Sequence, residues 1–312
     1  MKQIKFLVVS IFFASILFIG CKNSNKSKVT ASEKTELTDA EDEWVSIWNG
    51  KDLTGWNTYF NSPFSGFDKT QEGYLGLNNP KQDVIKVVQL EDGNVIRISG
   101  TAFGMMSTEQ DFGNYHLKLK VKWGKDKHVP KEKEIRDSGL LYHGFGEPGS
   151  SYAWMNSHEM QIQEENMGDY IAIGDIVMDV PSKPMDGIFY QYDKNSALRT
   201  YYGTKLFKDD RLVEPVDDFN DSYAKMYVAK DSDKENKYGE WNDIDLICFG
   251  DSSIHMVNGT VVMRLFNSKK TSDKSPVGYG KIGLQSEGAE VYYKDIRLKK
   301  INKMPAKLVT IE

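Results

Sequence analysis

Three polar side chains alternate along the stretch SHEMQIQE near the middle of the chain. In an extended strand, Glu159, Gln161 and Gln163 would project from one face. Met160 and Ile162 would project from the other face. Carboxylates can transfer protons and amides can hydrogen-bond hydroxyl groups, whereas neither side chain is a favoured strand former. The pattern predicts a polar face with a chemical role. The alternative is a solvent-exposed sheet face that has no such role.

A histidine ends a second apolar stretch, SGLLYH, upstream of the first. If the two stretches pair in a sheet, we expect His143 to lie near Glu159 or Gln161. An imidazole beside a carboxylate can relay a proton or bind a divalent metal. We therefore predict Glu159, His143 and Gln161 as catalytic residues, with His143 and Glu159 as the ligands if a divalent metal takes part.

Five further side chains are candidates for binding a sugar substrate: Gln163, Trp154, His255, Gln285 and Lys294. Trp154 lies in the Gly-rich connection between the two stretches, where its ring could stack on a sugar. His255 could add an imidazole to the polar face or be an exposed strand histidine. Gln285 could line the same face or cap a turn. Lys294 could bind an anion or belong to a solvated strand face.

The composition narrows the class of protein. The chain has 312 residues, of which 39% are hydrophobic and 12% aromatic, including 16 Tyr and 6 Trp. This length suits one large all-β domain or two small ones, and flat aromatic rings suit sugar-binding surfaces. The net charge is −5 and no Lys/Arg cluster stands out along the sequence, so we expect no nucleic-acid partner.

The first 20 residues are typical of a signal peptide. Lys2 and Lys5 precede an apolar run, and the run ends at Gly20 followed by Cys21. A small residue before a cysteine at this place is typical of a bacterial lipoprotein signal, and Cys21 is then the lipidated residue. The alternative is an ordinary signal peptide cut near Gly20.

We expect residues 21–43 to be a disordered tether, because they are polar and hold too few large apolar side chains to fold. The globular domain would then span residues 44–303. The lipid would anchor the chain in the cell envelope, at the outer membrane, with the leaflet left open. A lipidated Cys21 leaves Cys248 without a disulfide partner, and we interpret Cys248 as a buried, inert side chain.

Short alternating segments separated by Gly, Asn and Asp predict many strands. They lie at residues 94–100, 115–123, 138–143, 158–163, 243–250, 253–265, 280–288 and 291–301. Asn258-Gly259 between two apolar runs predicts a tight hairpin. This pattern favours an all-β sandwich or jelly roll. Residues 165–240 show few clear strands, and we expect them to form long loops that decorate the sandwich.

Five motifs together resemble the 3-keto-disaccharide hydrolase family. Its members are also described as 3-keto-glucoside 1,2-lyases and 3-keto-2-hydroxyglucal hydratases. The motifs, in the family's order, are SIWNGKDLTGW (46–56), DSGLLYH (137–143), HEMQIQE (158–164), GEWNDIDLICFGDSSIHMVNG (239–259) and GYGKIGLQSEGAEVYYKDIRLKKI (278–301). The resemblance covers residues 44–301.

The resemblance implies a concanavalin A-like or LamG-like two-sheet sandwich that acts on oligosaccharides or glycosides oxidised at C3. The implied reaction removes the C2 proton, expels the C1 substituent by β-elimination and adds water to the resulting glucal. His143, Glu159 and Gln161 fall on matching family elements. Asp137 stands where many relatives have Asn, and Lys294 replaces a common Arg. The alternative function is a non-catalytic carbohydrate-binding lipoprotein.

Overall fold

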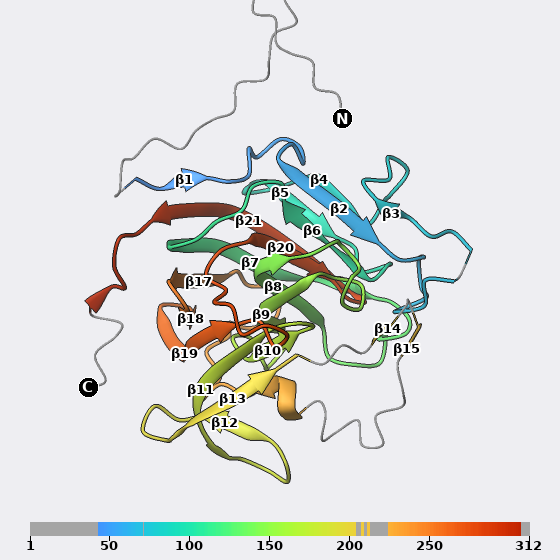
Figure 1. Ribbon diagram of the computed structural model, residues 1–312. Coiled ribbons are helices and arrows are strands. Elements are labelled where there is room, and N and C mark those ends of the chain that lie inside the picture. The colour runs from blue at the N-terminus through green and yellow to red at the C-terminus, as the bar shows by residue number, and fades with distance from the viewer. Residues whose placement is uncertain (1–42, 71, 204–206, 209–210, 213–223, 307–312) are drawn as a thin grey trace, which may run out of the picture. The chain divides into compact units, whose positions relative to one another are not determined.

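Two antiparallel sheets make up almost all of the domain (Figure 1). The computed structural model describes residues 43–70, 72–203, 207–208, 211–212 and 224–306. The predicted signal peptide, Cys21 and nearly all of the predicted tether lie outside the described residues. Among the described residues, no helix has both the length and the apolar character needed to cross a membrane.

The larger sheet, called sheet A, has eleven strands in the order β12-β11-β19-β18-β17-β7-β21-β5-β4, with β1 paired to β21 and β13 paired to β11. Its strands are β1 (Val45–Ser46), β4 (Ile85–Leu90), β5 (Gly93–Ile98), β7 (Tyr115–Lys127), β11 (Val177–Pro184), β12 (Tyr190–Tyr192), β13 (Leu198–Tyr202), β17 (Asn242–Phe249), β18 (Ser252–Val257), β19 (Thr260–Lys269) and β21 (Ala289–Lys300).

The smaller sheet, called sheet B, has eight strands in the order β16-β10-β9-β8-β20-β6-β2-β3. They are β2 (Trp56–Phe60), β3 (Gly76–Leu77), β6 (Gly104–Thr108), β8 (Asp137–Phe145), β9 (Asn156–Gln163), β10 (Tyr170–Ile173), β16 (Tyr227–Val228) and β20 (Lys281–Ser286). A separate two-stranded ladder joins β14 (Phe207–Lys208) and β15 (Arg211–Leu212).

Contacts between the sheets define an inner and an outer face for each sheet. The Ser138 hydroxyl on β8 lies 2.8 Å from the Tyr293 hydroxyl on β21. The Tyr142 hydroxyl, also on β8, lies 2.9 Å from the Ser253 hydroxyl on β18. Because side chains alternate along a strand, Asp137, Gly139 and Leu141 face away from sheet A, on the outer face of sheet B.

The two-sheet sandwich predicted from the sequence is confirmed, and each of the eight predicted segments forms strand structure. The hairpin is also confirmed: Val257 pairs with Thr260, and Asn258 and Gly259 both have positive φ values, 48° and 76°. Two successive positive values define the tight turn that Asn-Gly favours, because these residues tolerate the left-handed conformation.

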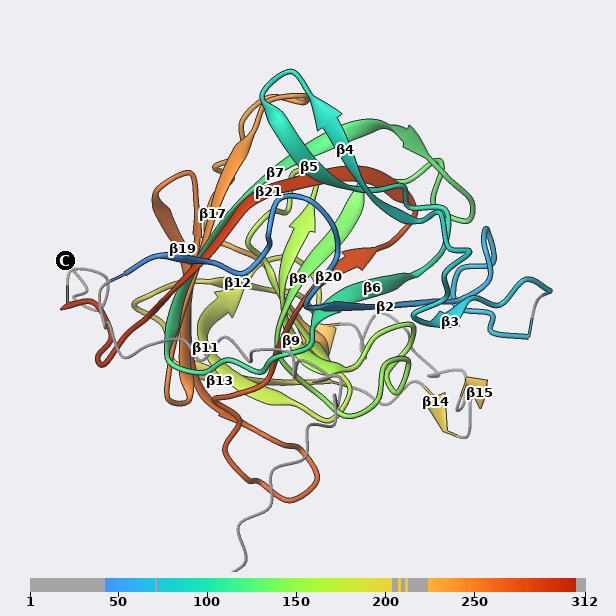
Figure 2. The same cartoon turned by 90° about the horizontal axis from the view of Figure 1, so that it is seen from above.

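The prediction of long loops over residues 165–240 was wrong for part of this region. β10 and β16 extend sheet B, while β11, β12 and β13 extend sheet A. The strand signal is weak here because polar and charged residues interrupt it, as in DIVMDVPSKP, where the strand is completed by pairing with distant partners. Figure 2 shows β11, β12 and β13 lying together with β19 on one side of the domain.

Candidate active site

The polar face predicted for strand β9 exists and lies on the outer face of sheet B. Glu159 pairs across the sheet with Leu141, and Gln161 pairs with Gly139. Met160 and Ile162 are fully buried on the opposite face, between the sheets. Glu159 and Gln161 are only 3% exposed, so this polar face is covered rather than wet. A buried carboxylate and a buried amide on one strand face need partners or a ligand.

Gly139 provides the space in which two of these side chains meet. A Cβ at this position would lie 2.3 Å from Glu159 Oε1 and 2.5 Å from Gln285 Oε1. Gln285 is fully buried on β20, the other neighbour of β8. The sequence left open whether Gln285 lines the polar face or caps a turn, and the structure places it beside Glu159.

A lysine and two more acids continue this polar surface. The ammonium group of Lys131 donates a hydrogen bond to Asp137 and lies 2.8 Å from Glu287 Oε1. Asp137 is the cross-strand partner of Gln163, which is partly exposed. We call Lys131, Asp137, Glu159, Gln161, Gln285 and Glu287 the acid cluster. It holds three carboxyl groups and one ammonium group.

Four polar atoms of the acid cluster lack a hydrogen-bond partner of normal geometry among the described residues. They are Asp137 Oδ1, Gln161 Oε1, and both Oε1 and Nε2 of Gln285. Buried polar groups in folded proteins are nearly always paired, and each exception calls for a physical reason. Here the unpaired atoms gather on one face, as expected of a surface that hydrogen-bonds a polar ligand.

The electrostatic balance favours protonation within the acid cluster. Burial, together with repulsion from Glu287 and Asp137, holds the pKa of Glu159 well above its ordinary range. Burial also raises the pKa of Glu287 to about 7, against the attraction of Lys131. Burial alone would lower the pKa of Lys131, but Glu287 and Asp137 outweigh it and raise the pKa. One ammonium group cannot balance three carboxylates, which favours the protonated form of Glu159.

Aromatic side chains cover the surface next to Glu159. Trp154 packs with Leu141, the partner of Glu159, in a cluster of buried apolar residues. The indole N–H of Trp154 donates a hydrogen bond of 3.0 Å to the Gly104 carbonyl, and the side chain is only 5% exposed. Trp154 therefore has no open ring face for a sugar. Phe67 meets Trp154 edge-on at 5.6 Å and is 37% exposed, which makes it the better stacking surface.

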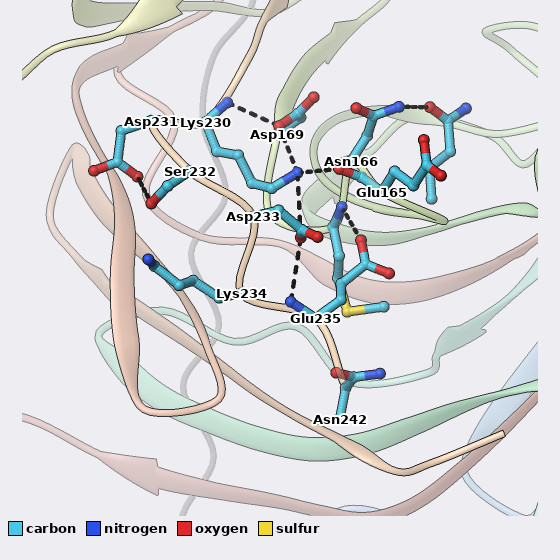
Figure 3. Close-up of polar contacts among 12 residues, drawn as sticks. Glu165, Asn166, Asp169, Lys230, Asp231, Ser232, Asp233, Lys234, Glu235 and Asn242 are labelled. Atoms are coloured by element: carbon cyan, nitrogen blue, oxygen red, sulfur yellow. Dashed lines mark hydrogen bonds and ion pairs between the residues drawn. The ribbon is translucent and has the colours of Figure 1, made fainter. Parts of the chain in front are cut away.

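A buried lysine, Lys230, stabilises the neighbouring edge of the site. The Lys230 ammonium donates a hydrogen bond of 2.5 Å to the Glu165 carbonyl, and its backbone N–H donates one of 2.8 Å to Asp169. Figure 3 shows both contacts as dashed lines. Asp169 also accepts a hydrogen bond from the Tyr227 hydroxyl. Tyr227 pairs with Ile171, the neighbour of Glu159 on β10, so this network holds an aromatic ring at the edge of the polar face.

The predicted histidines lie elsewhere, between the two sheets. His143 is 2% exposed, and its ring lies 5.9 Å from the ring of Tyr115 in sheet A. It has a positive φ of 50° at the irregular end of β8, and this backbone turn places it on the inner side. The expected approach of His143 to Glu159, and a metal site made by these two residues, was therefore wrong.

His255 also faces inward, which corrects both interpretations offered by the sequence. It is fully buried, with Nε2 3.1 Å from the Tyr142 hydroxyl and Nδ1 3.0 Å from the Gly168 carbonyl. It is neither an exposed strand residue nor part of the polar face. Burial lowers the pKa of both His143 and His255 to about 4. Both imidazoles are neutral core groups at pH 7.

Lys294 lies on the other sheet, away from the acid cluster. Its ammonium group pairs with Asp92 and sits 4.3 Å from the centre of the Trp241 ring. It borders a groove of about 770 Å³ lined also by Trp48, Asn49 and Asn94. Asn49 and Trp48 use their polar groups within their own turn, through Asp52. The structure does not bring Lys294 together with Glu159.

Sequence reasoning missed Lys131, Glu287 and the role of Asp137. The period of two that singled out β9 also applies to DSGLL, where Asp137 and Gly139 share the face of Leu141. It applies again to LQSE, where Gln285 and Glu287 share a face. Lys131 carries no such signal, because a loop places it. Cys248 is buried as expected, and burial raises the pKa of its thiol to about 12.

The fold and the acid cluster together define a two-sheet sandwich protein with a buried, acid-rich polar site on one outer sheet face. Residues 43–299 match the profile of the 3-keto-alpha-glucoside-1,2-lyase-like domain family, and the chain belongs to that family. The family resemblance drawn from the motifs is thereby confirmed, and membership supports a carbohydrate-active function.

Solved structures with a similar fold share little sequence with this chain. A protein from Parabacteroides distasonis ATCC 8503, provisionally named a glycosyl hydrolase, is 20% identical over 86% of this chain and 99% of its own, with a TM-score of 0.45. The carbohydrate-binding module CBM66 from Bacillus subtilis is 9% identical over 80% of this chain and 97% of its own, with a TM-score of 0.37. No functionally curated protein matches the chain.

Proposed function

We propose that this chain is a carbohydrate-active enzyme that cleaves the glycosidic bond of 3-keto sugars by elimination and rehydration. The observation that carries the proposal is the acid cluster. It combines a carboxyl group whose pKa is held well above its ordinary range, a second with a pKa of about 7, an ammonium group and unpaired amides on one buried face. Family membership supplies the substrate class.

The elimination step needs a base, a cation and an acid. A ketone at C3 acidifies the proton on C2, and Glu287, with its pKa near neutrality, suits the removal of that proton. Lys131 would stabilise the negative charge that develops on the C3 oxygen. Glu159, whose protonated form is favoured by burial, would donate its proton to the departing oxygen as the C1–O bond breaks and the C1–C2 double bond forms.

Rehydration returns both groups to their starting states. Water attacks C1 and gives its proton to the Glu159 carboxylate, while the protonated Glu287 returns a proton to C2. Gln161 and Gln285 would hold the sugar hydroxyl groups through their unpaired amide atoms. The sequence predicted both Glu159 and His143 as catalytic residues, without fixed roles. The geometry favours Glu159 as the acid, and His143 lies on the inner face.

The donor set of the site does not fit a divalent metal. The Lys131 ammonium pairs with both Asp137 and Glu287, so a cation already neutralises the carboxylates that could hold a metal ion. No group of three or more His, Cys, Asp or Glu side chains within the described part of the chain is arranged to hold a metal. We therefore assign stabilisation of the negative charge on the C3 oxygen to Lys131, and the proposed mechanism uses no metal ion.

The test is turnover of a 3-keto-glucoside by the purified protein, with and without a chelator. We expect a glucal and then free 3-ketoglucose, at a rate that the chelator leaves unchanged. Glu159→Gln should lower kcat by about 100-fold or more, because the leaving group loses its proton donor. The absence of turnover across several glycosidic linkages, with a folded protein, would contradict the proposal.

A second candidate function is carbohydrate binding without catalysis. The unpaired amide atoms of Gln161 and Gln285 favour it, because they can recognise hydroxyl groups without any proton transfer. Binding of an oligosaccharide measured by calorimetry, with no product formed over long incubation, would support this candidate over the enzyme.

We also propose that the chain is a lipoprotein of the cell envelope, anchored through Cys21. The signal pattern that ends at Gly20-Cys21 supports this. Cys21→Ser should abolish labelling of the protein by a fatty-acid probe and release it from the membrane fraction. Unchanged labelling in the variant would contradict the anchor.

A further inference from the structure

Six basic side chains gather on the outer face of sheet A, on the side opposite the acid cluster. On β7, Lys118, Lys120 and Lys122 alternate with the buried residues Leu117, Leu119 and Val121, so they point outward. On β21, Lys294, Arg297 and Lys299 do the same around a bulge. We call these six residues the basic face. They are separated along the sequence, which is why no cluster stood out there.

The register of the two strands sets like charges against each other. Lys118 lies directly opposite Arg297, and Lys120 lies directly opposite Lys294. Like charges in this relationship destabilise a sheet. Three carboxylates relieve the repulsion in part: Asp245 lies 3.2 Å from Lys118, Asp243 lies 2.5 Å from Lys120, and Asp92 pairs with Lys294. Even with Asp295 of the β21 bulge added, the face carries excess positive charge, although the whole chain is at −5.

Two partly exposed tryptophans stand among these cations. The ring centre of Trp44 lies 5.3 Å from the Lys118 ammonium, 5.6 Å from Lys299 and 6.0 Å from the Arg297 guanidinium. Trp241 lies beneath Lys294 and Lys122, at 4.3 and 4.7 Å. Tryptophan together with Lys and Arg is the combination found where proteins meet the headgroup region of a bilayer.

The chain enters the domain on this same face. Trp44 is the second described residue, and β1, which follows it, pairs with β21 at Leu298 and Arg297. The predicted lipid anchor at Cys21 precedes Trp44 by a tether that spans at most about 80 Å when fully extended. A domain held this close to a membrane samples its surface continually, so even weak attraction would orient it.

We propose that the basic face docks on the anionic phospholipid headgroups of the membrane that holds the lipid anchor. Each Lys or Arg near an anionic bilayer gains attraction that decays within a Debye length, and the tryptophans would enter the headgroup layer. The acid cluster, on the outer face of sheet B, then points away from the bilayer toward soluble glycans. The proposal depends on the predicted anchor and is independent of the catalytic proposal.

Tryptophan quenching by brominated phospholipids tests the docking. The full chain, purified from membranes as cells produce it, is reconstituted in phosphatidylcholine vesicles with or without phosphatidylglycerol. The other four tryptophans, Trp48, Trp56, Trp123 and Trp154, are each 5% exposed, so surface quenching reports Trp44 and Trp241. We expect quenching in the anionic vesicles to be at least about two-fold greater than in the neutral vesicles. High salt should reverse this difference, because screening weakens the attraction.

Charge reversal identifies the face that docks. Lys118→Glu with Arg297→Glu should reduce quenching in anionic vesicles to the level of neutral vesicles. The matched control reverses Lys81 and Lys133, two exposed lysines outside the basic face. Equal quenching in both kinds of vesicle would overturn the proposal. So would an effect of the control pair as large as that of the test pair, or binding of a soluble acidic polysaccharide in place of anionic vesicles. Circular dichroism verifies that each variant is folded.

Discussion

Glu159 and Gln285 converge over Gly139 from the two strands that flank β8. Their Oε1 atoms lie 2.3 and 2.5 Å from the point where a Cβ on Gly139 would stand, so only glycine leaves both side chains where they are. Gly139 thereby lets a carboxyl group and an amide lie side by side on this face. The main chain of β8 forms the floor of the acid cluster.

Gly139→Ala should remove activity while leaving the fold intact. The new methyl group would displace Glu159 and Gln285, and displacement of catalytic groups by about 1 Å can lower the rate about 100-fold. We expect a loss of kcat/KM of that order, measured with a 3-keto-glucoside. Gly283→Ala is the matched control, because its Cβ would lie 3.3 Å from its nearest neighbours, Leu141 on β8 and the Met106 carbonyl on β6. Equal losses in both variants would argue against the special role of Gly139.

Glu159→Gln should change the dependence of stability on pH. The folded-state pKa of Glu159 is raised by burial, so the neutral form favours folding. Its contribution is fully present below the ordinary Glu pKa and is lost as the pH rises through the folded pKa. The variant, which cannot ionise, should unfold at a higher temperature than the parent at pH 8 and at the same temperature at pH 4. A lower Tm for the variant at pH 8 would mean that Glu159 is ionised and paired.

The fold could be predicted from the sequence because strand signals are local. Alternation at residues 115–123 and the turn at Asn258-Gly259 fix the strand faces and one hairpin without knowledge of distant partners. β11 was missed because its sequence carries Asp179, Pro181 and Lys183, and its strand state depends on pairing with β13 and β19. Such pairing is a long-range property that no short window contains.

The candidate site could be predicted from the sequence only in part. Alternation correctly placed Glu159 and Gln161 on one face, but alternation failed at His143, where a positive φ turns the side chain inward. Lys131 could not be found, because a loop of residues 128–136 carries it across to Asp137 and Glu287. Loop geometry and strand irregularities depend on the whole fold rather than on local sequence periods.

His143→Asn should preserve activity and reduce sensitivity to acid. Asn tolerates the positive φ at this position and does not titrate. The folded-state pKa of His143 is lowered to about 4, so its contribution to stability is present above pH 6.5 and lost as the pH falls through about 4. That loss is worth about 3 kcal/mol at most. The variant should show a smaller drop in Tm between pH 7 and pH 4. A loss of kcat of about 100-fold would instead indicate that His143 is catalytic, because removing a general base lowers the rate by about 10²–10⁴-fold.

Lys131→Met should shift the pH dependence of the reaction as well as slow it. Removing the ammonium group takes away the attraction that opposes burial at Glu287, so the pKa of Glu287 should rise above its present value of about 7. The acid limb of the kcat/KM profile, which reports the base in the free enzyme, should then move to higher pH. Lys131→Arg should restore part of the rate, because it keeps the charge. Lys133→Met, an exposed neighbour in the same loop, should leave both rate and profile unchanged. A Lys131→Met variant that is slower at every pH with an unshifted acid limb would show that Glu287 is not the base.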